Sequence, residues 1–115
     1  KEVENFYLSG LKRAIETLMP KWLNITRLAP SAVKYKNLKS VWGRCDYKTR
    51  EIMFALQLFS RSVEEIEYVI MHELCHLVVP NHGKEFKALE SKFMPNWKEI
   101  KKKLKTNTPE YTTVL

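Results

Sequence analysis

The segment HELCHLVVPNH, at positions 72–82, constrains this chain more than any other part of its sequence. It contains all three histidines of the 115 residues, and the first two belong to the pattern H-E-x-x-H. Residues four positions apart lie on the same face of an α-helix, so His72 and His76 can bind one ion if this segment is helical. The fold must therefore present this helix with one face open to a metal ion.

The third ligand of this predicted site is less constrained than the first two. Zinc is the expected ion, because imidazole suits it and a catalytic zinc has three protein ligands and one open position. His82 is the favoured third ligand, since Pro80 ends the helix and the chain can then turn back. The spacing is similar to the H-E-x-x-H-x-x-G-x-x-H arrangement of the metzincins, with Val79 at the glycine position. The acidic alternatives are Glu85, Glu90 and Glu99.

A purely structural zinc site is a further alternative, and it would be closed by a fourth residue, usually a cysteine. Neighbouring side chains on a helix differ in direction by about 100°. Cys75 is therefore expected to face the core rather than the ion that His76 binds. Cys45 is the other candidate in the sequence. A catalytic site with one open position is favoured.

Glu73 lies beside His72 on the predicted helix and can face a metal-bound water without binding the metal itself. Zinc lowers the pKa of its bound water toward ~7. Glu73 is then the predicted general base, which takes the proton as the water attacks a carbonyl and delivers it to the leaving amine. The residue that helps zinc to hold the oxyanion is left open among Tyr47, Tyr68 and Arg44.

Hydrophobic periodicity predicts the elements around this site. Helices are expected at residues 3–23, 63–76, 84–94 and 97–105, and strands at 33–36, 41–45 and 51–59, with the last two strands forming a hairpin. Pro20 is expected to stop or kink the first helix, and Ser62 with Glu65 fits a capping box for the second. This order predicts an α+β fold with a small, mostly antiparallel sheet. A single domain at residues 1–105 and a flexible tail at 106–115 are expected.

Two stretches of the sequence, VWGRCDYKTREIMFALQL and VIMHELCHLVVPNHGKEFKALESKFMPNWKEIKKKL, resemble the YgjP-like family of small zinc metallopeptidases. This family is related to the SprT-like and WLM proteases and to the minigluzincins, and the resemblance spans residues 33–104. It implies a minimal zincin fold with one zinc ion per chain. It also implies that zinc is bound by His72, His76 and His82, with Glu73 as the catalytic acid and base.

The resemblance further implies that the substrate is a peptide or protein that adds to the edge of the hairpin strand as an extended chain. Trp42, Gly43 and Arg44 are the candidate substrate-binding residues on that strand. The family commonly has Trp-Gly-Ser-Cys here, so Arg44 and Asp46 stand where small hydroxyl residues are usual, and the specificity is expected to differ.

The charge of the chain indicates what partners it binds, and its composition indicates where in the cell it is found. Its net charge of +7 favours acidic partners, and basic residues crowd positions 98–105. DNA is therefore a candidate partner, and a solvated helix face is the alternative explanation. Two cysteines do not make a disulfide framework, and no apolar run approaches the ~18–20 residues of a membrane span, so a cytoplasmic protein is expected.

Two functions from different classes follow from these features. The favoured function is a zinc-dependent metallopeptidase that hydrolyses peptide bonds. The alternative is a basic DNA-associated or scaffold module that retains zinc but has weak or no hydrolysis. Glu73 favours hydrolysis, because a structural zinc has no use for a carboxylate beside its ligand.

Overall fold

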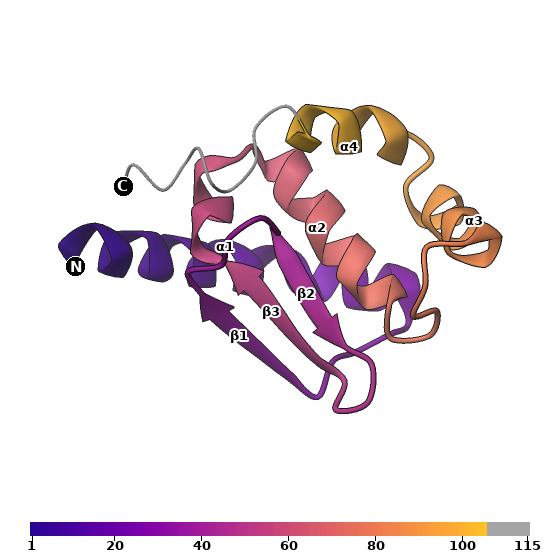
Figure 1. Ribbon diagram of the computed structural model, residues 1–115, viewed down its shortest axis with the longest axis horizontal. Helices are drawn as coiled ribbons and strands as arrows, with labels where there is room; N and C mark the ends of the chain where they lie inside the picture. The colour runs from indigo at the N-terminus through magenta and orange to yellow at the C-terminus, as the bar shows by residue number, and fades with distance from the viewer. Residues whose placement is uncertain (106–115) are drawn as a thin grey trace.

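The computed structural model describes residues 1–105 (Figure 1). The predicted flexible tail, residues 106–115, lies outside the described residues. The elements in chain order are α1 (Glu2–Thr26), β1 (Ala32–Lys36), β2 (Gly43–Asp46), β3 (Glu51–Ala55), the short 3-10 helix η1 (Leu56–Ser60), α2 (Val63–Cys75), α3 (Lys84–Phe93) and α4 (Trp97–Lys105). The predicted α+β class, with an N-terminal helix, a hairpin and C-terminal helices, is confirmed.

The three strands form a mixed sheet in the order β1-β3-β2. The predicted hairpin is confirmed, because β2 and β3 are antiparallel and Cys45 lies opposite Ile52. The sheet is not mostly antiparallel, since β1 and β3 are parallel. The last strand, β3, is inserted between β1 and β2. It is parallel to β1 and antiparallel to β2. This order leaves β2 at an edge of the described sheet, beside α2 (Figure 1).

The two faces of the sheet differ in polarity. The inner face, with Ile52 and Phe54 fully buried, packs in one core with residues of α1 and α2. On the outer face, the exposed residues Lys34 of β1 and Arg44 of β2 lie on either side of Met53 of β3, their partner in the sheet register. Because strand side chains alternate between faces, Gly43 and Cys45 lie on the inner face, toward α2.

Two predicted element ends in the N-terminal half are wrong. Pro20 does not end α1, which continues to Thr26 because Met19 and Trp22 on both sides of the proline are buried in the core. The helix ends at Arg27, which has a left-handed backbone with φ 60°. The third strand ends at Ala55 rather than extending to residue 59, and η1 follows. Residues 56–58 are all buried in this 3-10 helix, which places them in the core without continuing the strand.

Helix α2 begins with the predicted capping box. Ser62 Oγ accepts a hydrogen bond from the Glu65 backbone N–H at 3.2 Å, and the Glu65 carboxylate accepts one from the Ser62 N–H at 3.0 Å. The helix ends at Cys75, with His76 as its C-terminal cap, so it stops before Pro80. The four residues between His76 and Asn81 redirect the chain toward α3. Among residues 1–105, no helix has the length and apolar character to cross a membrane.

Candidate active site and metal centre

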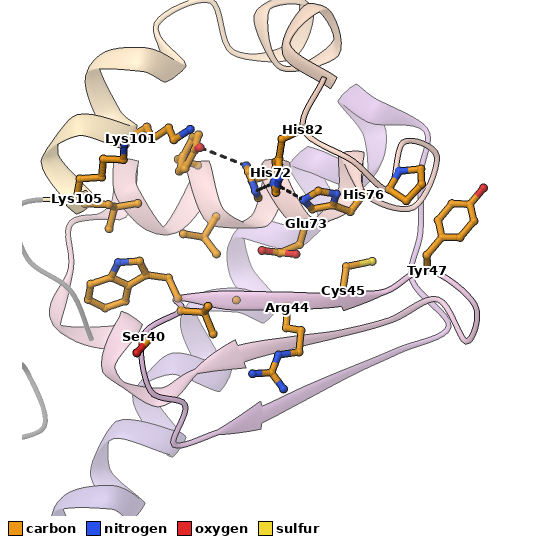
Figure 2. A pocket seen from close by; sticks show the side chains of 17 residues that line it. Ser40, Arg44, Cys45, Tyr47, His72, Glu73, His76, His82, Lys101 and Lys105 are labelled. Carbon is orange, nitrogen blue, oxygen red and sulfur yellow. Dashed lines mark hydrogen bonds between the residues drawn. The ribbon is translucent and has the colours of Figure 1, made fainter. Parts of the chain in front are cut away.

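The three histidine rings converge at the C-terminal end of α2 (Figure 2). Their ligand nitrogens all lie within 4.8 Å of one another. His82 Nε2 is 3.0 Å from His76 Nε2 and 3.4 Å from His72 Nε2. Two nitrogens that each lie ~2.05 Å from a tetrahedral zinc ion are about 3.3 Å apart. The donor set and its spacing therefore fit a zinc ion.

The second ring nitrogens of the two α2 histidines face away from this centre and have partners. His76 Nδ1 lies 3.1 Å from the Val79 carbonyl oxygen, which accepts its hydrogen bond. His72 Nδ1 lies 2.7 Å from Oε2 of Glu90 on α3, and that carboxylate is only 2% exposed. Such partners fix the tautomer and leave each Nε2 lone pair facing the metal position.

Phe86 on α3 supports all three rings from one side. Its ring centroid lies 4.3 Å from that of His76, 4.9 Å from that of His72 and 5.0 Å from that of His82. The sequence pattern alone gives Phe86 no part in the site. Its position four residues after His82, at the start of the next helix, was the available signal.

The acidic alternatives for the third ligand have other places. Glu90 binds His72 Nδ1 rather than joining the ligand group, and Glu85 and Glu99 are exposed outside that group. Cys75 is fully buried in the core, as predicted. Among residues 1–105, the group of side chains placed to bind a metal ion is His72, His76 and His82.

Burial keeps His76 and His82 available as neutral ligands. Burial and the charge of His72 lower the pKa of His76 to about 4, although the hydrogen bond to the Val79 carbonyl raises it. Burial, His72 and Lys101 lower the pKa of His82. Metal binding requires deprotonated imidazole. Both rings therefore meet this requirement at neutral pH without an energetic cost for losing a proton.

Glu73 lies between α2 and β2, with 5% of its surface exposed. A Cβ atom at Gly43 would lie 3.0 Å from Glu73 Oε2 and 3.0 Å from a methyl group of Val69. The glycine therefore lets the strand approach the carboxylate closely. Burial raises the pKa of Glu73 to about 7, with His72 lowering it and Glu90 raising it. A carboxylate with such a pKa can both accept and release a proton near neutral pH.

The centre lies in a cleft with a volume of about 510 Å³ between β2, α2 and α4 (Figure 2). The predicted substrate-binding residues Trp42, Gly43 and Arg44 all line it. The Arg44 side chain, however, points away from Glu73, because strand alternation places it on the other face of the sheet (Figure 2). The cleft extends along β2 from Tyr47 at one end to Ser40 at the other.

The three candidates for holding the oxyanion are placed differently. Tyr68 is buried, and its hydroxyl lies 3.2 Å from His72 Nδ1. Burial and the nearby Glu90 raise the pKa of Tyr68, so it remains a phenol. Tyr47 is 49% exposed at the end of the cleft. The described contacts bring neither tyrosine hydroxyl nor the Arg44 guanidinium to the open side of the histidine centre.

Burial of the Glu73 carboxylate predicts a pH-dependent effect on stability in the metal-free protein. Its pKa rises from 4.5 to about 7 on folding, so the folded state loses stability as the pH rises through 7. Glu73→Gln removes this loss. Urea unfolding at several pH values should show the variant gaining up to ~3 kcal/mol over wild type between pH 4.5 and pH 8. A difference that does not change with pH would contradict the burial argument.

Comparisons with known proteins agree with this geometry. A family model described as "YgjP-like, metallopeptidase domain" matches residues 1–107. The crystal structure of the metallopeptidase zymogen abylysin of Pyrococcus abyssi is similar, with TM-score 0.71 and 26% identity over 80% of this chain and 92% of that chain. The zymogen jannalysin of Methanocaldococcus jannaschii shares the fold, with TM-score 0.65 and 22% identity over 77% of this chain and 91% of that one. Curated proteins give no match. The family match over nearly the whole sequence shows that this chain belongs to the YgjP-like family of metallopeptidase domains.

Proposed function

We propose that His72, His76 and His82 bind the zinc ion of this metallopeptidase domain and that Glu73 transfers the protons of peptide hydrolysis. The observation that carries the proposal is the convergence of three imidazole nitrogens at 3.0 and 3.4 Å beside a buried carboxylate. The family match supports zinc and peptide hydrolysis. The alternative of a binding module without hydrolysis is not favoured by that match.

Zinc at such a site supplies an activated water and polarises the scissile carbonyl. Glu73 accepts a proton from the water as the water oxygen bonds to the carbonyl carbon. The carbon–nitrogen bond then breaks, and Glu73 returns the proton to the leaving amine nitrogen. Burial raises the pKa of this carboxylate to about 7 in the metal-free protein, and the charge of a bound zinc ion would lower it. Gly43 has no side chain, so β2 can pass close to this carboxylate.

The substrate is proposed to be a peptide that extends along β2. That strand lies at the edge of the described sheet and borders the cleft, so its backbone groups are available for pairing. Trp42 and Gly43 would contact the peptide from the cleft side. Arg44 would contribute its backbone, because its side chain points to the opposite face (Figure 2).

Metal removal tests the proposal. Chelator-treated protein should lose casein cleavage, and about one equivalent of zinc per chain should restore it. Magnesium added at the same concentration is the control, since it prefers oxygen ligands. Cleavage that persists in chelator at full rate would argue against a metal-dependent reaction.

The cellular location of the protein and a DNA partner are also proposed. We place the protein in the cytoplasm, because both of its cysteines are free thiols. DNA is a second candidate partner, favoured by the exposed lysines of α4. Binding through phosphate contacts is independent of sequence and weakens steeply with salt. Retention on a DNA column that does not change with salt would count against it.

A further inference from the structure

Two of the five lysines on α4, Lys101 and Lys105, line the active-site cleft. They are four positions apart, so they share one face of the helix. Figure 2 shows both side chains on the Ser40 side of the histidines, away from Tyr47. The other three α4 lysines, at positions 98, 102 and 103, do not line the cleft.

Neither cleft lysine takes part in an ion pair with a described residue. The α4 lysine that does so is Lys103, at 3.6 Å from Glu64. Lys101 Nζ lies 5.7 Å from the ring centroid of Trp97, a contact that leaves its charge uncompensated. The ammonium groups at this end of the cleft therefore have no carboxylate partner among residues 1–105.

Acidic side chains are almost absent from the described lining of the cleft. Glu73 is the only acidic residue that lines the cleft among the described residues, and it lies at the centre rather than at the lysine end. An anionic group of a substrate would meet attraction at the lysine end and no repulsion from a neighbouring carboxylate.

The wall beside the two lysines is apolar. The apolar residues that line the cleft are Val41, Trp42, Tyr68, Val69 and Leu104, of which Leu104 lies between the two lysines on α4. Tyr68 and Leu104 are buried, whereas Lys101 is half-buried and Lys105 is exposed. An apolar wall bordered by ammonium groups suits a group with a short hydrocarbon stem and a terminal carboxylate.

We propose that Lys101 and Lys105 bind a carboxylate of the substrate peptide and so select peptides that place a carboxylate at the Ser40 end of the cleft. This inference rests on the proposed function, because it requires that a peptide occupies the cleft. The carboxylate belongs either to a Glu or Asp side chain or to the C-terminus of the peptide. The chemistry of recognition is the same for both sources.

A pair of double variants provides a matched test. Lys101→Glu with Lys105→Glu reverses the charge at the cleft, and Lys98→Glu with Lys102→Glu does so elsewhere on α4. Both pairs have i, i+4 spacing. Glu73→Gln, the background of both, raises the net charge from +7 to +8, and two Lys→Glu changes of −2 each then take it to +4 in either case. Both are made in the zinc-loaded Glu73→Gln protein, so that peptides bind without being cleaved. Lys101→Gln with Lys105→Gln removes the two charges without reversing them. This second version is used if the charge reversal impairs folding.

The probes are fluorescent alanine-rich peptides that carry one Glu, Gln or Lys at each position in turn, with an amidated C-terminus. A parallel set has a free C-terminus. Fluorescence anisotropy at low salt should show the Glu peptide binding about fivefold more tightly than the Gln peptide at one position, or the free C-terminus more tightly than the amide. The preference should disappear or reverse with the 101/105 pair and persist with the 98/102 pair.

Two results would overturn the inference. One is equal binding of the Glu, Gln and Lys peptides together with equal binding of the free and amidated ends. The other is a preference that both double variants reduce alike, which would assign it to overall charge. The proposed function fails separately: wild type that binds acidic peptides through Lys101 and Lys105 but cleaves none would keep the recognition and remove the hydrolysis.

Discussion

Glu73→Gln is expected to lower kcat/KM for peptide cleavage by about 10³-fold while about one zinc ion remains bound per chain. The amide has nearly the shape of the carboxylate, so it fills the same space against Gly43. It cannot accept the proton of the attacking water. The measurement is cleavage of a quenched fluorescent casein by zinc-loaded protein, with zinc content determined on the same samples.

Glu64→Gln is the matched control for this variant. It makes the same substitution on the same helix, at an exposed position in the first turn. Its kcat/KM should stay within about twofold of wild type, since surface changes have small effects. Unimpaired cleavage by Glu73→Gln would mean that another group activates the water. Loss of zinc from Glu73→Gln would instead assign the residue to metal binding.

The sequence predicted the centre of the site because its chemistry is local. His72 and His76 are one helical turn apart, and Ser62 with Glu65 marks where that helix begins, so spacing alone determines their shared face. His82 lies only six residues further on, and the structure places it at the same centre. Contacts that span a few residues of one helix and its following turn are thus readable without a structure.

The supporting contacts are not local, and the sequence did not predict them. Glu90 lies 18 positions after His72, and its contact with the ring depends on how α3 packs against α2. The side-chain direction of Arg44 depends on the sheet register, which a shift of one residue would invert. The place of β1 next to β3 likewise depends on a crossing of the chain that hydrophobic periodicity does not record.

Pro20 and residues 56–59 show that local sequence patterns do not determine where helices and strands end. Local propensity predicted that Pro20 stops or kinks the first helix, but the helix continues to Thr26, with Met19 and Trp22 buried on both sides of the proline. The apolar residues after Ala55 fit strand alternation and short helical turns equally well. Tertiary packing decides both cases.

His82→Ala is expected to weaken zinc binding by more than about 100-fold. The ring contributes one of three nitrogens, and its removal leaves a two-histidine site. Loss of a residue that only orients a ligand typically costs about 10- to 100-fold, so removing the ligand itself should exceed that range. Competition with a chelator of known affinity, at constant pH, measures the change directly.

The zinc affinity of His82→Ala is compared with that of variants at Glu85, Glu90 and Glu99, the acidic alternatives for the third ligand. Glu85→Ala and Glu99→Ala should keep wild-type zinc affinity, because both side chains are exposed and outside the histidine group. Glu90→Gln should weaken binding by about 10- to 100-fold, since it loses the charged acceptor 2.7 Å from His72 Nδ1 but leaves all three rings in place. The order His82→Ala, then Glu90→Gln, then the two exposed sites separates a ligand from a residue that positions one. If Glu90→Gln instead lost zinc as completely as His82→Ala, Glu90 would have to bind the ion directly, as a further ligand beside the three histidines.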